Sequence, residues 1–330
     1  MKKKLITIMT VALMLMGCGY VEDKESSVQA GGNSTADSIR VGVLRTADSL
    51  PIYVGEKTGL FEKYGVNVEL VEFSSASNQS KAIEGGAIDG MMTDMVVQNL
   101  LIKGGTDLRA VATALGENVV EGKFLIVSSP NSGIESIEDV EGKKIGISEG
   151  TMMEYLVDSY WSELGLDINK IEKVNIPSLS LRFETLNADE IDLAILPDPM
   201  GDLAIAGGCK EIVNDTTLKN NYSVTVIAFT KKFIDENESV VRKFMEGYNA
   251  AVDRINEHND EDLELIYYVA NVPEALQGTW QIPHYPKNSV PTQEEVENIT
   301  KWMVEKDLLN TTVDYDQEVD TRFGSEEGRK

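Results

Sequence analysis

The sequence predicts an α/β fold of two Rossmann-like lobes, joined by two crossing strands and followed by C-terminal helices. The first observation is that a strand–helix pattern recurs about 105 residues later, a spacing that suits two similar lobes and is too long for a solenoid. The repeat is marked by Gly59-Leu60 and Gly165-Leu166, and by Ile88-Asp89 and Ile191-Asp192. The second observation is a pair of apolar strands, 124–128 and 222–230, where the chain would cross between the lobes.

The first lobe is expected to open with a strand over residues 39–44. It should continue with a helix from Pro51, a strand over 66–73, a helix from Asn78, and a helix that Thr93 and Asp94 cap and that ends at Lys103. In the second lobe we expect a strand over 144–147, a helix over 151–164 and a buried strand over 191–196 that breaks at Pro197.

Three more helices are predicted after the second crossing, over residues 237–258, 261–271 and 292–309. The last begins with the capping box Thr292-Gln-Glu-Glu295. We therefore predict that lobe one contains residues 38–122 and 223–330, and that lobe two contains residues 123–222. Two crossing strands would let the lobes close about a ligand.

The amino end has the pattern of a targeting segment. Lys2, Lys3 and Lys4 precede an apolar run over 5–17 that is shorter than the roughly 20 residues needed to span a bilayer. Leu15-Met16-Gly17-Cys18 resembles the bacterial lipobox. Residues 1–17 are thus predicted to be a signal peptide, and residues 18–37 a lipidated flexible tether. The mature protein would then be extracytoplasmic, held at the cell membrane by a lipid on Cys18.

Composition excludes several functions. The net charge of −25 repels nucleic acid and does not steer anions, so a bound anion would need local donors. With two His and two Cys, the sequence has no metal-binding spacing, and it has no phosphate-binding glycine motif. We predict a monomer without metal or cofactor.

Polar loops follow the strands of both lobes. They contain Arg45 to Pro51, Ser74 to Asn78, Thr93-Asp94, Ser148 to Thr151 and Pro197 to Pro199. Ligands of open α/β sheets bind outside the carboxyl ends of the strands, so these loops are the predicted site.

Several ordered motifs resemble one family of solute-binding proteins. They are the run from Ile137 to Ile147, the Leu164-Gly165-Leu166 turn, Asp198-Pro199 and Gly59-Leu-Phe61. That family serves ABC importers of thiamine precursors, alkanesulfonates, nitrate and related solutes. The resemblance implies a type 2 periplasmic-binding fold, a ligand held between the lobes, and a permease with its ATPase as partners. Asp198-Pro199 and the Met-Met pairs at 91–92 and 152–153 depart from the commoner pattern, which leaves the ligand open.

The resemblance also implies binding residues on both rims. The first-lobe rim comprises Arg45, Asp48, Ser49, Ser74, Ser75, Asn78, Thr93 and Asp94, and the second-lobe rim comprises Gly150, Thr151, Met152, Arg182 and Asp198. A sulfonate or another small anion would use Arg45 and Arg182. A heteroaromatic ligand would stack on Tyr53, Phe73, Tyr155 or Phe183 and bind the three Asp residues. Three carboxylates against two arginines favour the heteroaromatic, such as a thiamine-type pyrimidine precursor.

An enzyme is the main alternative. Gly146-Ile-Ser148-Glu-Gly150 matches the G-x-S-x-G turn of serine hydrolases at a strand-to-helix junction. A triad would need His258 or His284 as the base, and no His-Gly-Gly oxyanion loop exists in the sequence. Because the family resemblance explains the turn without catalysis, we predict no enzyme activity. A ligand-sensing domain of a membrane receptor is a further alternative.

Overall fold

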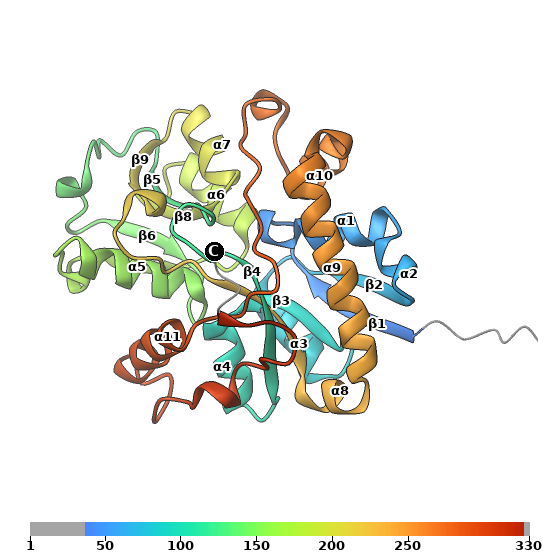
Figure 1. Cartoon of the computed structure of the whole chain (residues 1–330). Coiled ribbons are helices and arrows are strands. Elements are labelled where there is room, and N and C mark those ends of the chain that lie inside the picture. The colour runs from blue at the N-terminus through green and yellow to red at the C-terminus, as the bar shows by residue number, and fades with distance from the viewer. Residues whose placement is uncertain (1–36, 327–330) are drawn as a thin grey trace, which may run out of the picture. The chain divides into compact units, whose positions relative to one another are not determined.

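The computed structural model describes residues 37–326, which form two β-sheets with helices packed against them (Figure 1). The first sheet contains five strands in the order β2-β1-β3-β10-β4. Its strands are β1 (Asp37–Val43), β2 (Val66–Glu72), β3 (Gly90–Asp94), β4 (Leu108–Leu115) and β10 (Thr225–Thr230). β1 runs parallel to β2 and β3, whereas β10 runs antiparallel to β3 and β4.

The second sheet repeats this plan in the order β7-β6-β8-β5-β9. Its strands are β5 (Phe124–Ser128), β6 (Lys144–Ile147), β7 (Glu172–Asn175), β8 (Leu193–Pro197) and β9 (Lys210–Asn214). β6 is parallel to β7 and β8, and β5 is antiparallel to β8 and β9. The fourth strand in each order, β10 or β5, runs antiparallel to its neighbours and directly follows a segment that connects the two sheets. The predicted fold class is therefore confirmed.

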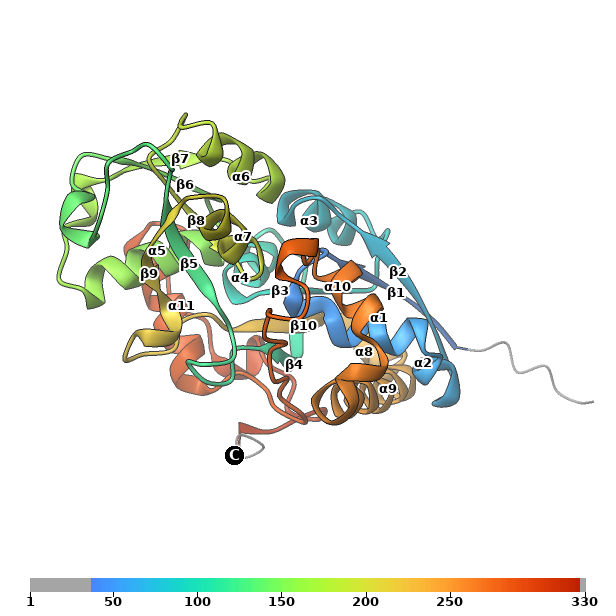
Figure 2. The same ribbon diagram turned by 90° about the horizontal axis from the view of Figure 1, so that it is seen from above.

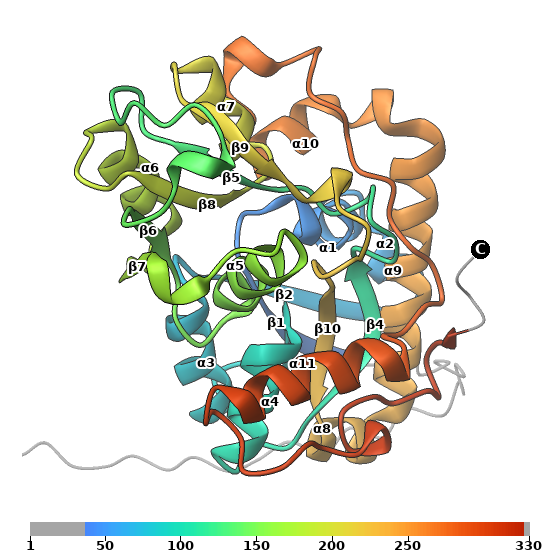
Figure 3. The same ribbon diagram turned by 90° about the vertical axis from the view of Figure 1, so that its left-hand side faces the viewer.

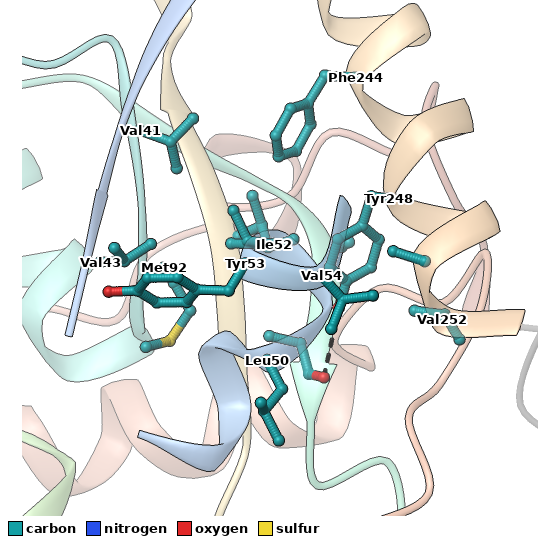
Figure 4. Packing of buried hydrophobic residues seen from close by; sticks show 14 of the residues in the cluster. Val41, Val43, Leu50, Ile52, Tyr53, Val54, Met92, Phe244, Tyr248 and Val252 are labelled. Atoms are coloured by element: carbon teal, nitrogen blue, oxygen red, sulfur yellow. Dashed lines mark hydrogen bonds between the residues drawn. The ribbon is translucent and has the colours of Figure 1, made fainter. Parts of the chain in front are cut away.

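Helices α1 (Leu50–Lys57), α2 (Leu60–Lys63) and α9 (Glu238–His258) lie together over one face of the first sheet (Figure 2). They enclose an apolar core around Val41, Val43, Phe244 and Tyr248 (Figure 4). Tyr53 is 3% exposed within this core, so it does not serve as a stacking surface for a ligand. The apolar positions of β1 and of the long amphipathic α9 supply the two halves of this packing.

On the other face of the first sheet lie α3 (Ala76–Glu84) and α4 (Met95–Lys103), which enclose a smaller cluster with Met91 and Leu108. The second sheet packs against α5 (Met152–Glu163), α6 (Leu179–Asn187) and α7 (Met200–Ala206). The chain after β10 forms α8 (Lys231–Glu236), α9, α10 (Leu263–Val269) and α11 (Gln293–Glu305). No helix among the described residues is both long and apolar enough to cross a membrane.

The two crossings between the sheets lie against each other. Residues 116–123 connect β4 to β5, and residues 215–224 connect β9 to β10. The side-chain amide of Asn221 donates to the carbonyl of Gly116 at 2.6 Å. Gly116 has φ +83°, and a Cβ there would lie 2.0 Å from the carbonyl oxygen of Ser223, so this contact requires glycine. The predicted lobe limits fall within these two crossings and stay predictions.

Helix α11 packs against both halves of the molecule, beside α4 and α5 (Figure 3). The indole N–H of Trp302 donates to Asp158 of α5 at 3.0 Å, and Met303 joins an apolar cluster that includes residues of both sheets. The capping box predicted at its start is present, with Thr292 and Glu295 bonding to each other's backbone N–H.

Some predicted element ends differ from the observed ones. α5 begins at Met152 because Thr151 is its N-cap, and the Thr151 hydroxyl accepts from the N–H of Met153 at 3.2 Å. α10 begins at Leu263 because a 3₁₀ turn over Asn259–Glu261 precedes it. β8 includes Pro197, which pairs with Phe124 at the end of the strand, where the missing N–H of proline is tolerated.

Candidate functional site

A cavity of about 110 Å³ lies between the two sheets. That volume is several times the ~10–15 Å³ that one water molecule needs, so a small molecule fits. Its walls form at the carboxyl ends of strands: Leu44 follows β1, Thr93 and Asp94 end β3, Ser148 follows β6, and Pro197 ends β8. This is the edge at which open α/β sheets bind ligands.

Seven of the predicted binding residues line this cavity. They are Asp48, Thr93, Asp94, Thr151, Met152, Arg182 and Asp198. The structure thus brings together residues from four strand ends and from the starts of α4 and α5. It also places Ser148 and the apolar side chains of Met92, Phe124 and Pro283 in the lining.

Six predicted residues do not line the cavity, and most of them have local roles. They are Arg45, Ser49, Ser74, Ser75, Asn78 and Gly150. The guanidinium of Arg45 lies over the Tyr268 ring, 4.3 Å from its centroid, and donates to the Tyr268 carbonyl. Ser75 caps α3 by accepting from the N–H of Asn78, and Gly150 donates to Glu154. Ser49 is fully buried.

Six polar lining residues were not among the predicted binding residues: Thr46, Gln79, Lys123, Ser148, Ser223 and Thr225. The Gln79 side chain is 1% exposed and donates to the carbonyl of Met92 at 2.9 Å, which leaves its own oxygen unpaired. Thr225 begins β10 and pairs in register with Asp94. Lys123 and Thr225 both stand at the start of a crossing strand, and that position is the signal that would have indicated them.

Asp94 caps the start of α4 and also lines the cavity. One of its oxygens accepts from the N–H of Val97 at 2.9 Å. Burial raises the pKa of Asp94 to about 6, and the charge of Asp48 adds to this, while the N–H groups of Val97, Met152 and Val96 act in the opposite direction. Met152 begins α5, which packs against the second sheet, whereas Val96 and Val97 belong to α4. The carboxyl of Asp94 therefore faces backbone N–H groups from both sides of the cavity.

The carboxyl of Asp48 forms no ion pair within residues 37–326. Burial raises the pKa of Asp48, and the nearby hydroxyls of Thr46 and Thr225 offset part of this rise. Among the residues that the structure describes, neither hydroxyl makes a hydrogen bond of ordinary geometry, and the Oδ1 atom of Asp48 has no partner. Buried polar atoms are normally paired, so this part of the wall has unused acceptor capacity.

Arg182 extends from the first turn of α6, a helix capped by Ser178. Its side chain is fully buried and passes over Gly146, where a Cβ would come within 3.1 Å of the arginine Cγ. Two of its nitrogens donate to the carbonyls of Ile176 and Ile195 at 3.0 and 2.9 Å, and Nη2 has no partner in the described part of the chain. Burial lowers the pKa of Arg182 to about 10, so it stays positively charged at neutral pH.

Asp198 connects the second sheet to the segment before α11. One of its oxygens accepts from the indole N–H of Trp280, a residue packed in the core of the first sheet. The other lies 3.7 Å from the Lys123 ammonium, which also pairs with Asp202 at 2.6 Å. Burial raises the pKa of Asp198 to about 7, with Trp280 and Lys123 opposing the rise.

The cavity does not contain the parts of a serine hydrolase. Ser148 lines it, but no histidine does so among the described residues. His284 is exposed, and its Nδ1 lies 3.6 Å from Glu121, while the side chain of His258 lies outside the described part of the chain. The Ser148 carbonyl accepts from the Thr151 hydroxyl at 2.8 Å, so the G-x-S-x-G turn leads into the capped start of α5. Within residues 37–326 no group of three or more His, Cys, Asp or Glu residues could hold a metal ion.

Comparison with known proteins defines the class. Residues 46–262 match the family described as NMT1/THI5 like, which covers more than half of the chain, and the chain therefore belongs to that family. A relative from Bacillus subtilis (strain 168), named a putative aliphatic sulfonates-binding protein, is 25% identical over 98% of this chain and 94% of its own length.

Two solved structures show the same fold. One is the ligand-binding component of an ABC-type import system from Staphylococcus aureus with zinc bound, with a TM-score of 0.73 at 16% identity over 87% of this chain and 97% of that chain. The other is the periplasmic aliphatic sulphonate binding protein from Escherichia coli, with a TM-score of 0.71 at 17% identity over 86% and 97%. At these identities the likeness establishes the periplasmic-binding-protein fold alone.

Proposed function

We propose that this protein is the solute-binding subunit of an ABC importer. It captures a small solute between its two lobes and presents the closed form to a membrane permease and its ATPase. The observation that carries the proposal is the cavity between the sheets, whose walls on both sides contain polar atoms that have no hydrogen-bond partner among the described residues. The relatives named as binding proteins support it. No histidine in the described part of the chain lines the cavity beside Ser148, which favours binding over hydrolysis.

Two ligand classes compete at this site. A thiamine-type pyrimidine precursor or another basic heteroaromatic would bind Asp48, Asp94 and Asp198, whereas a sulfonate would bind Arg182. Tyr53, Phe73, Tyr155 and Phe183 do not line the cavity, so a stacking contact would fall to Phe124. Arg45 is engaged with Tyr268 and would not hold an anion in the cavity.

A thermal-shift screen tests the proposed function. Thiamine precursors, sulfonates, nitrate and aromatic acids would each be added to the purified protein. A cognate solute at a hundredfold over Kd should stabilise the folded state by about 2.7 kcal/mol. Ala76 lines the cavity, so Ala76→Phe should remove the shift by filling it, while Ala87→Phe on the surface should keep it. The same shift in both variants would contradict binding in this cavity.

We also propose that a lipid on Cys18 anchors the protein on the outer side of the cell membrane. Cys18 lies outside the described residues, and support comes from the basic, apolar and Leu-Met-Gly-Cys order of residues 2–18. Cys18→Ala should abolish labelling by a fatty acid and move the protein out of the membrane fraction. Cys209→Ala is the matched control and should stay labelled. A labelled, membrane-bound Cys18→Ala protein would refute the anchor.

A further inference from the structure

The wall that the first sheet contributes to the cavity offers acceptors and hydroxyls. Its unpartnered atoms are the carboxyl Oδ1 of Asp48, the amide oxygen of Gln79, and the hydroxyls of Thr46, Thr93 and Thr225. Apart from Lys123 and Arg182, no lysine or arginine lines the cavity among the described residues, and neither of these two belongs to an element of the first sheet. This wall therefore contains two carboxyls and no cationic side chain among the described residues, and it is rich in acceptors.

Asp48 and Asp94 on that wall lack counter-charges. Among the described residues, neither carboxyl forms an ion pair with a lysine, arginine or histidine. The two are close enough for the charge of Asp48 to raise the pKa of Asp94. Two carboxyls that face one small cavity repel each other when both are ionised, and a positive group between them would remove this cost.

The wall of the second sheet carries the opposite charge at Arg182. This guanidinium is fully buried, and no carboxylate pairs with it in the described part of the chain. Its Nε and Nη1 are fixed by two backbone carbonyls, which leaves Nη2 as an unused charged donor. Lys123, by contrast, is neutralised by Asp198 and Asp202. A buried, uncompensated charge is costly unless a bound group completes it.

We propose, on the basis of the proposed function, that the cavity selects a small bipolar solute, with a protonated nitrogen that binds Asp48 and Asp94 and an oxyanion that binds Arg182. A simple anion would satisfy Arg182 and would add a third negative charge beside the two carboxyls. A simple cation would satisfy the carboxyls and leave Arg182 uncompensated. Only a solute with both charges forms ion pairs with the carboxyls of one wall and with Arg182 of the other. The specificity therefore arises from repulsion of singly charged solutes as well as from attraction of the bipolar one.

Matched probes with a single carbon skeleton test this selection. Isothermal titration would compare 2-aminoethanesulfonate with ethanesulfonate, which lacks the nitrogen, and with ethylamine, which lacks the oxyanion. A second set, 3-aminopropanoate against propanoate, distinguishes a carboxylate from a sulfonate as the oxyanion. We expect the affinity of each bipolar probe that binds to be about tenfold or more above that of the probe without the nitrogen and that of the probe without the oxyanion. This is the factor expected for the loss of one charge-assisted hydrogen bond.

Two variants test which residue binds the nitrogen of the solute and which binds its oxyanion. Asp48→Asn keeps the shape of the side chain and should reduce the preference for the amino probe over ethanesulfonate by about tenfold. Arg182→Gln should reduce the preference for the same probe over ethylamine. Asp107→Asn is the matched control, because Asp107 pairs with Arg109 outside the cavity, and it should bind like the wild type. If Arg182→Gln does not fold, the affinities of the wild type for 2-aminoethanesulfonate and for ethylamine still test whether the oxyanion contributes to binding.

The outcomes separate this proposal from the function on which it rests. Binding of ethanesulfonate as tight as that of 2-aminoethanesulfonate, or Asp48→Asn with an unchanged preference, would overturn the bipolar selection. So would a failure of every bipolar probe to bind. In each case a different solute that stabilises the protein in the thermal-shift screen, and loses its effect in Ala76→Phe, would leave the binding function standing.

Discussion

Glu318 is a buried carboxyl that does not line the cavity. We expect it to make the stability of the protein depend on pH. It is fully buried, and one of its oxygens accepts from the side-chain amide of Asn99 at 2.6 Å, while Oε1 has no partner. Its backbone carbonyl accepts from Gln98 and from the N–H of Ala110, each at 2.8 Å. Burial raises the pKa of Glu318 from 4.5 to about 8, with Asn99 and Arg109 opposing the rise.

The sign of the effect follows from the direction of this shift. Between pH 4.5 and 8 the folded protein holds a proton on Glu318 that the unfolded chain releases. The stabilisation is therefore complete below pH 4.5 and is lost as the pH rises toward 8. Glu318→Gln keeps a neutral side chain at every pH, so its free energy of unfolding should fall less over this range than that of the wild type. The difference should be on the order of 5 kcal/mol across the full shift from 4.5 to about 8.

Urea unfolding at several pH values measures this difference. Other buried carboxyls, among them Asp215 and Asp198, shift in the same direction, and the comparison of two proteins cancels their contribution. Glu305→Gln is the control, because Glu305 is an exposed residue at the end of α11. Parallel pH curves for Glu318→Gln and the wild type would show that Glu318 is ionised in the folded state.

Helices and strands with clear end signals could be predicted from the sequence. The capping box at Thr292 identified α11, and Asp94 was correctly predicted to cap α4. The strand over Lys144–Ile147 has the predicted ends, because its apolar run is bounded by turns. In contrast, α6 was not predicted. Its sequence from Leu179 to Phe183 alternates apolar and polar residues with the period of a strand, and packing against the second sheet overrides that pattern.

The candidate cavity could be predicted only in its position. Strand ends indicated the edge of each sheet where the cavity lies, and the aspartates at 48, 94 and 198 line it. Which side chain of a loop faces the ligand depends on contacts that are distant in sequence. Arg45 is turned away by Tyr268, and Gln79 is fixed by Met92. Neither contact leaves a local pattern in the sequence.

The arrangement of the two sheets supports a clamp. The crossings at Gly116 and Ser223 lie side by side and join the lobes, while contacts across the cavity connect them elsewhere. Those contacts include the bond from Trp280 to Asp198 and the Met152 N–H that faces Asp94. Each sheet also has an apolar cluster of its own, whereas the cluster around Met303 contains residues of both sheets. We expect the lobes to rotate about the crossings, with α11 and this shared cluster as the pivot.

We propose that a solute bound by both walls draws the two lobes together. A ligand shifts such an equilibrium only if it binds the closed form more tightly, which requires contacts with both lobes. Small-angle X-ray scattering of the protein with and without a saturating cognate solute measures this directly. We predict that the radius of gyration falls on saturation in the wild type, and that Asp94→Asn and Asp198→Asn each weaken the same solute although they lie on opposite walls. An unchanged radius of gyration at saturation, with only one of the two walls sensitive to substitution, would contradict the clamp.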